Sequence, residues 1–139
     1  MKPHEYSRTL TELESDDWGE PNYPSHLVVE THRLRKVPII DFTAEDFRIM
    51  IGQQISLEIL VPKAIEMLAQ DPLVSGDFYS GDLLLAVLSK GGEFLRLNEY
   101  WKNKVLNIVE EHQEQIAEES RWLSKQVTEA VNALKACDS

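Results

Sequence analysis

The stretch Asp41–Gln70 decides the fold class and reads DFTAEDFRIMIGQQISLEILVPKAIEMLAQ. Thr43 stands where a helix N-cap belongs, and Asp46 follows three residues later, at the position of the acid in a capping box. Phe42 and Phe47 have the spacing of a hydrophobic staple, which fixes the direction in which the chain enters a helix. The sequence therefore predicts a helix that begins after Thr43 and buries Phe47.

The apolar positions of this stretch predict two helices. In the first helix Phe47, Met50 and Ile51 share one face. After Gly52 the apolar stripe changes register, and its later members fall on one narrow face: Leu57, Leu60, Val61, Ala64, Ile65 and Leu68. Pro62 lies off this stripe, so we expect a kink in the second helix rather than a break. This central kinked pair is the predicted core.

Shorter helices are expected on both sides of the central pair. Residues 1–8 show no apolar period and are predicted to be loose, whereas Thr9–Glu14 has the pattern of one capped turn. Ser25 is placed to cap a helix through Lys36, with Leu27, Val28, Thr31 and Leu34 facing inward. Ser80 or Asp82 opens a helix through Leu83–Leu88, which is apolar on all sides and therefore buried.

The C-terminal segment, residues 93–139, contains neither glycine nor proline. Its apolar residues keep a near-heptad spacing, which is interrupted by the polar pair Glu119–Ser120. We interpret the segment as two long antiparallel helices, with one long helix as the alternative. No alternating pattern predicts a strand. The predicted fold is all-α, with one compact multi-helix domain over 1–139 and a motif-bearing core over 9–92.

Composition limits the class of protein without deciding the function. A chain of 139 residues with 42% hydrophobic residues is typical of one soluble domain. The net charge of −10 would repel nucleic-acid backbones and would speed an encounter with a basic protein, although acidity is also a common means of solubility. The apolar runs are too short to span a bilayer, and the N-terminus has no apolar export region. A single cysteine, Cys137, fits a reducing cytoplasm.

No pattern of residues predicts catalysis, a metal site or a cofactor site. The histidines are scattered and form no spacing typical of metal ligands: His4, His26, His32 and His112. The segment Gly76–Asp82 is rich in glycine, but it follows a helix rather than a strand and its two aspartates would repel phosphate. We interpret it as a turn and a helix cap, with Phe78 and Tyr79 closing the core. The protein is predicted not to be an enzyme.

Two acidic surfaces are candidates for binding a partner. The first surrounds Trp18, whose indole we expect to fold back onto the core, and comprises Asp16, Asp17 and Glu20. The second is a stripe on the C-terminal segment, on the face opposite its apolar residues: Glu110, Glu111, Glu114 and Glu118. Most charged stripes are simply solvated, and the alternative for this one is a docking surface for a basic protein.

Three ungapped motifs resemble one protein family. They are DDWGEP at 16–21, DFTAEDFRIMIGQQ at 41–54 and GDFYSGDLL at 76–84. Together they are similar to the all-helical branch of the immunity proteins of bacterial contact-dependent growth inhibition (CDI) systems. The resemblance runs from about Leu10 to Leu88, and nothing from Ser89 onward matches closely.

The resemblance implies a cytoplasmic protein that binds the toxic C-terminal domain of its cognate effector and neutralises it by stoichiometric occlusion. Many such toxins are nucleases and therefore basic, which suits an acidic partner. Because selectivity arises where relatives differ, we expect the toxin to contact Glu110, Glu111, Glu114 and Glu118, with Asp16, Asp17 and Glu20 as the alternative. A small acidic helical adaptor unrelated to toxins is the second interpretation.

Overall fold

The computed structural model describes residues 6–19 and 25–136, and the regular structure in these ranges is helical, with one isolated β-bridge between Ser75 and Ser80. None of the helices in these ranges has the length and apolarity needed to cross a bilayer. The elements follow in this order: α1 Leu10–Glu14, α2 His26–Leu34, the 3-10 helix η2 Ile39–Asp41, α3 Ala44–Gly52, α4 Leu57–Gln70, α5 Asp82–Ser89, α6 Gly92–Leu97, α7 Glu99–Glu111, α8 Gln113–Glu119 and α9 Arg121–Ala136.

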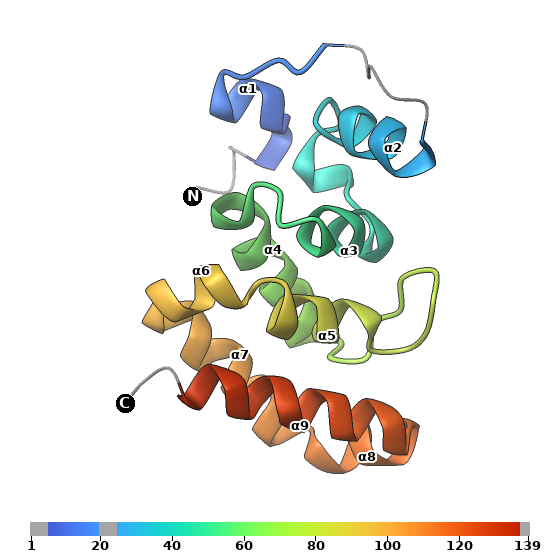
Figure 1. Cartoon of the computed structure of the whole chain (residues 1–139), viewed down its shortest axis with the longest axis vertical. Helices are drawn as coiled ribbons and strands as arrows, with labels where there is room; N and C mark the ends of the chain where they lie inside the picture. The colour runs from blue at the N-terminus through green and yellow to red at the C-terminus, as the bar shows by residue number, and fades with distance from the viewer. Residues whose placement is uncertain (1–5, 20–24, 137–139) are drawn as a thin grey trace.

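The central helices α3, α4 and α5 separate the N-terminal helices from the C-terminal ones (Figure 1). α3 packs against both α4 and α5, and α2 covers it from the N-terminal side. On the other side α9 packs on α5 and α7 packs on α4. The central pair predicted from Asp41–Gln70 is therefore enclosed by helices from both ends of the chain.

The beginning of α3 agrees with the sequence prediction. The Thr43 side chain accepts a hydrogen bond from the Asp46 backbone N–H, and the Asp46 side chain accepts one from the Thr43 backbone N–H, which completes the capping box. The rings of Phe42 and Phe47 lie 5.1 Å apart, and both side chains are buried. The staple therefore joins the start of α3 to the core. Met50 and Ile51 are buried beside Phe47.

α4 continues through Pro62 as predicted, without ending there. Its expected stripe is buried, apart from Leu57, which is only partly covered. The connection between α3 and α4 turns within four residues, and Gln54 and Ser56 adopt the left-handed backbone region there. The change of register after Gly52 thus corresponds to a change of helix direction.

The N-terminal helices agree with the prediction at their starts and differ elsewhere. Thr9 and Glu12 form a capping box for α1, and the Ser25 side chain accepts a hydrogen bond from Val28 N–H at the start of α2. α2 ends at Leu34, before the predicted Lys36, and Leu27 is exposed although we expected it to face inward. Tyr6 belongs to the segment expected to be loose but is buried. Residues 1–5 lie outside the described ranges.

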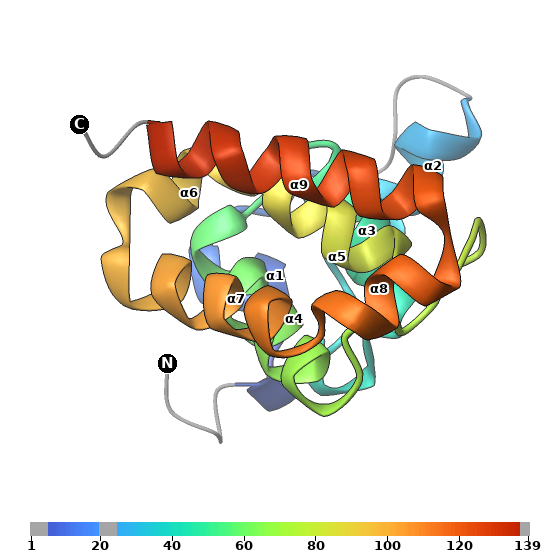
Figure 2. The same cartoon turned by 90° about the horizontal axis from the view of Figure 1, so that it is seen from below.

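The C-terminal segment turns back at Ser120, as predicted from its polar pair. The Ser120 backbone is extended, and its hydroxyl accepts a hydrogen bond from Leu123 N–H at 3.2 Å. α9 then runs antiparallel to α7 and α8 (Figure 2). The arm before Ser120, expected as one long helix, is divided at Asn98 and His112 into α6, α7 and α8. The apolar seam of the whole C-terminal segment, on both sides of Ser120, is nevertheless buried at Val105, Val109, Ile116, Leu123, Val127 and Leu134.

Candidate functional site

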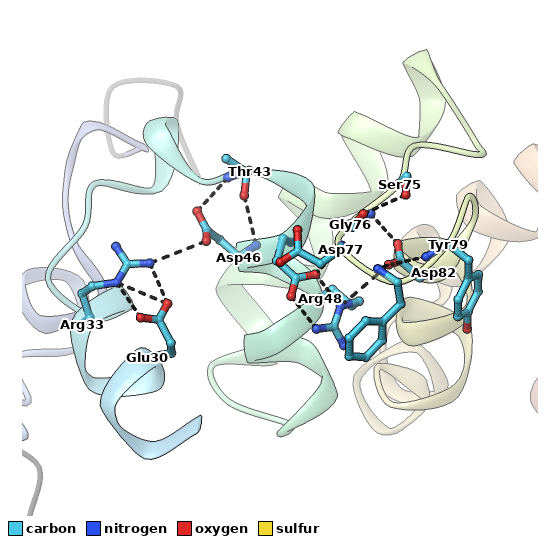
Figure 3. A network of polar contacts seen from close by, with 12 residues as sticks. Glu30, Arg33, Thr43, Asp46, Arg48, Ser75, Gly76, Asp77, Tyr79 and Asp82 are labelled. Carbon is cyan, nitrogen blue, oxygen red and sulfur yellow. Dashed lines mark hydrogen bonds and ion pairs between the residues drawn. The ribbon is translucent and has the colours of Figure 1, made fainter. Parts of the chain in front are cut away.

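A buried carboxylate holds the loop that precedes α5. Asp82 is 3% exposed and accepts hydrogen bonds from three backbone N–H groups, those of Gly76 at 2.6 Å, Phe78 at 3.1 Å and Tyr79 at 3.4 Å (Figure 3). A charged acceptor strengthens such hydrogen bonds. Asp82 is the first residue of α5, but its carboxylate binds the loop before the helix, and the N-cap position is Gly81, which has no side chain to cap α5. The predicted helix cap was therefore wrong, and Asp82 fixes the loop instead.

Arg48 connects this loop to α3. Its guanidinium donates two hydrogen bonds to Glu45, each 2.6 Å long, and its Nε lies 3.8 Å from Asp82 Oδ2. Glu45 Oε1 also accepts the backbone N–H of Asp77 at 2.9 Å. The hydrogen bond from Arg48 holds the pKa of Glu45 below its ordinary value, the Asp77 N–H acts in the same direction, and burial opposes both. Arg48 thus links α3, the loop and α5 through two carboxylates.

Two glycines allow the loop to approach its neighbours. A Cβ at Gly76 would lie 2.6 Å from Glu45 Oε1 and 2.9 Å from Asp82 Oδ2. Gly81 has φ +89°, a region that favours glycine, and a Cβ there would lie 2.6 Å from the Leu123 side chain of α9. The glycines serve close packing and a backbone turn, in agreement with the interpretation of this segment as structural.

The two aromatic residues of the loop have different environments. Tyr79 is half-buried, and its ring meets Trp122 of α9 edge-on at 5.3 Å. Phe78 was expected to close the core, but it is 70% exposed and lies under the Arg48 guanidinium at 4.0 Å. That prediction was wrong because the loop backbone, held by Asp82, directs the Phe78 ring outward.

A second buried charge organises the DDWG motif. The Arg35 side chain is almost fully buried, and its Nη1 donates to Glu14 Oε1 at 2.6 Å while its Nη2 donates to the backbone carbonyl of Asp16 at 2.9 Å. The ring of Trp18 lies 4.4 Å from the Arg35 guanidinium, within the range of a cation–π contact. We predicted that Trp18 packs on the apolar core. Instead its ring packs on Arg35 and meets the His32 ring edge to face, and the side chain is 37% exposed.

The acidic residues around Trp18 are placed at the surface. Asp16 and Asp17 are exposed, and the Asp17 carboxylate accepts the backbone N–H of Gly19 at 2.8 Å. Glu20, the third member of this candidate surface, lies outside the described residues. Asp16 takes part in the Arg35 contact through its backbone carbonyl, and the residue is exposed to solvent.

The four glutamates of the predicted C-terminal surface are all exposed. Glu110 and Glu111 end α7, whereas Glu114 and Glu118 belong to α8, so the stripe crosses the helix break at His112. His112 is half-buried, and its Nδ1 lies 2.8 Å from the Ile108 carbonyl. All four glutamates line one shallow surface hollow. The structure therefore brings together the residues that the sequence grouped, and we call them the α7–α8 acidic face.

A larger hollow was not predicted. It has a volume of about 880 Å³ and lies between α1, α4 as far as Glu66, and α6 with the start of α7. Its lining combines apolar side chains with carboxylates, and no lysine or arginine is among the described residues that line it. We call this hollow the acidic groove and define it by its four glutamates: Glu14, Glu58, Glu66 and Glu93.

No local pattern of residues predicted the burial of Arg35 or the acidic groove. In the sequence Arg35 is one of three cations, with Arg33 and Lys36, at the end of the predicted helix. Its partner Glu14 is 21 residues away. Glu58 and Glu93 come together only through the packing of α4 against α6. Each of them is an ordinary solvated acid when its own helix is considered alone.

The described residues contain no group of three or more His, Cys, Asp and Glu side chains that could hold a metal ion. His26, His32 and His112 belong to α2 or to the junction of α7 and α8, while His4 and Cys137 lie outside the described ranges. The arrangements above are ion pairs, caps and open surfaces. Their chemistry suits recognition of another molecule by charge and shape.

Comparison with known proteins identifies the family. The family model of CDI immunity proteins matches residues 12–105, which is more than half of the chain. No curated protein and no solved structure matches. The match contains the Arg35 contacts, the loop held by Asp82, and nearly all residues of the acidic groove, and it extends beyond Leu88, where the resemblance of the motifs ended. The chain therefore belongs to the family of CDI immunity proteins.

Proposed function

We propose that this protein binds the cognate toxin domain of a CDI effector in the cytoplasm and neutralises it by covering the surface that the toxin needs for its activity. The observation that carries this proposal is the family match over residues 12–105. Inhibition of this kind is stoichiometric: it requires neither turnover nor a cofactor, and the α-helical surface itself is the inhibitor.

The charge of the chain favours a basic partner. With a net charge of −10, the protein attracts a cationic domain over a distance of about one Debye length, roughly 8 Å at physiological salt. A nuclease is one class of toxin with such a charge, because it must bind phosphate backbones. A basic nuclease domain is therefore the partner that we propose.

Selectivity for one toxin is proposed to lie on the α7–α8 acidic face. Discrimination is a difference of affinities and must come from positions that vary between relatives. The family match ends at residue 105, so Glu110, Glu111, Glu114 and Glu118 lie beyond it. The segment 89–105, which we had expected to belong to the variable part, lies within the match. We therefore place the proposed selective surface beyond residue 105.

The proposed function is tested with the C-terminal domain of the effector encoded next to this gene. We expect the two purified proteins to form a one-to-one complex, measured by calorimetry and by light scattering after size exclusion. We also expect co-expression of this protein to restore growth of cells that produce the toxin domain. A toxin domain that neither binds this protein nor loses toxicity in its presence would contradict the proposal.

The site is tested by charge reversal. Glu110→Lys with Glu114→Lys should weaken binding, because like charges then face each other across the interface. Both side chains are exposed, so the fold should remain intact. Asp16→Lys with Asp17→Lys is the matched variant of the alternative surface. If only the Asp16→Lys with Asp17→Lys variant loses binding, the toxin contacts the DDWG motif and not the α7–α8 acidic face.

A further inference from the structure

We propose that the acidic groove receives a segment of the toxin domain in which a lysine or arginine side chain stands beside an apolar one. This inference rests on the proposed function and adds a second contact to it. The groove is formed by elements from three parts of the chain, α1, α4 and the α6–α7 junction, which lie side by side in Figure 1. Its volume of about 880 Å³ suits several side chains of a partner segment.

The apolar side of the groove offers contact area that the fold itself does not use. Leu97, at the end of α6, lines the groove and is 82% exposed, which makes it the most exposed of the large apolar side chains described. Trp101 is half-buried in the same lining, which also includes Phe94 with 8% exposure. Exposed apolar groups beside aromatic ones are typical of the centre of a protein interface.

The charged side of the groove specifies the kind of partner. Glu58 and Glu93 are exposed, and neither has an ion pair within the described ranges. Glu66 has a nearby cation, Lys63, at 3.4 Å, and Glu14 is occupied by Arg35. Two carboxylates therefore remain available at the groove, and a guanidinium or ammonium group is the complementary ligand.

Hydrogen bonds and an ion pair within the free protein hold one wall of the groove together. Ser56 precedes α4 and donates a hydrogen bond to Glu14 at 3.0 Å, while Arg35 Nη1 lies between them, 3.3 Å from the Ser56 hydroxyl and 2.6 Å from Glu14. These contacts hold the end of α1 against the start of α4, which form one wall of the groove. A preformed wall reduces the entropy that is lost on binding.

A second copy of this chain is a poorer occupant. Two copies carry the same net charge of −10, so the field that attracts a basic toxin opposes self-association. The groove and the α7–α8 acidic face each present glutamate carboxylates, which suit a cationic partner. The groove, however, lies almost entirely inside the family match and the α7–α8 acidic face lies outside it. We therefore assign general affinity to the groove and selectivity to the face.

The test compares two double charge reversals with the same change of net charge. The groove variant is Glu58→Lys with Glu93→Lys, and the control is Asp41→Lys with Glu129→Lys, whose side chains are exposed and lie outside the groove lining. We expect the groove variant to raise the Kd for the toxin domain by about 100-fold, and the control to raise it by less than about 5-fold. Circular dichroism and thermal unfolding verify that both variants fold.

A third variant tests the apolar side of the groove. Leu97→Ser should weaken binding about 10-fold without loss of stability, because the side chain is exposed in the free protein. Suppose that the wild-type protein binds the toxin domain, and that the Glu58→Lys with Glu93→Lys variant and the Leu97→Ser variant bind it as tightly as the wild-type protein does. The groove assignment is then overturned while the proposed function stands. If the wild-type protein fails to bind, both are overturned. A dimer that Leu97→Ser dissociates would assign the groove to a second copy.

Discussion

At the scale of single residues, buried ionised groups connect segments that the sequence keeps apart. Arg35 ties α1 and the DDWG motif to the start of α4, and Asp82 holds the loop before α5 through three backbone N–H groups. A buried charge is costly unless it is paired and hydrogen-bonded, so each of these groups constrains its surroundings. The Arg35 constraint lies beside the acidic groove, because its partner Glu14 belongs to the groove lining.

Phe47→Ala tests the residue that anchors the central helices. Phe47 is 1% exposed and its ring packs at a tilt against that of Phe42, so its removal leaves a cavity in the core. We expect the free energy of unfolding to fall by about 3–5 kcal/mol, measured by urea denaturation. Phe78→Ala is the control, with an expected loss of less than about 1 kcal/mol because that ring is exposed. Equal losses for the two variants would contradict the assigned core.

Glu45 predicts a pH dependence of stability. Its pKa in the folded protein lies below the ordinary value of 4.5, chiefly because Arg48 donates hydrogen bonds to it. The unfolded chain then binds more protons, so this stabilisation is complete above pH 4.5 and is lost as the pH falls through the folded pKa. Glu45→Gln should reduce stability near neutrality and flatten the decline in acid, as measured by urea denaturation across pH.

The matched control is Glu118→Gln, an exposed residue of α8 that lies far from Arg48 in the chain. This substitution should leave the acid decline unchanged. An identical pH profile for Glu45→Gln and the wild-type protein would mean that the Arg48 pair does not contribute to stability in solution.

At the scale of elements, short-range hydrogen bonds decide where the helices begin. Thr9, Ser25 and Thr43 each cap a helix through a side-chain oxygen, and all three positions were predicted from residue type and spacing. The divisions of the C-terminal arm at Asn98 and His112 have no such caps. There the chain bends where packing on α4 and α9 requires it, which a local pattern does not reveal.

Ser120→Ala tests the turn into α9. The Ser120 hydroxyl accepts the Leu123 N–H, and its loss leaves one N-terminal N–H of α9 without a side-chain partner. We expect a loss of about 1 kcal/mol in the free energy of unfolding. Ser120→Asp supplies another acceptor and should retain most of the stability. If both substitutions destabilise the protein equally, the side-chain cap is not what stabilises this turn.

At the scale of the whole molecule, we expect net charge to govern the approach of the proposed partner and local surfaces to govern the final complex. Acidic residues outnumber basic ones by 24 to 14, and both proposed contact surfaces are lined by glutamates. The acidic groove adds apolar contact area at Leu97 and Trp101. Binding through apolar contacts is not screened by salt, unlike the attraction between charges. Net charge is therefore expected to affect the rate of association, and the apolar contacts are expected to affect the rate of dissociation.

Salt should slow association of the toxin domain more than it accelerates dissociation. Long-range attraction between opposite net charges raises the on-rate, and screening at about 0.15 M salt already acts within roughly 8 Å. Stopped-flow mixing at two salt concentrations measures this effect. The control Asp41→Lys with Glu129→Lys should lower the on-rate modestly and leave the off-rate unchanged. An on-rate indifferent to salt would show that the net charge has no part in recognition.

The sequence by itself determined the helical class, the start of each N-terminal helix, the central pair and the turn at Ser120. These features depend on neighbours within about four residues, such as a cap at Thr43 or an apolar stripe along α4. The three family motifs likewise lie in continuous stretches. Interactions of this range are visible in the order of residues alone.

Only the tertiary structure decided the environment of Arg35, the outward direction of Phe78 and the existence of the acidic groove. Arg35 and Glu14 are 21 residues apart, and Glu45 and Asp77 are 32 apart. Whether a charged side chain is solvated or buried depends on which distant segment covers it, because the cost of desolvation is offset only by a partner brought there by folding. No periodicity along the chain encodes that partner.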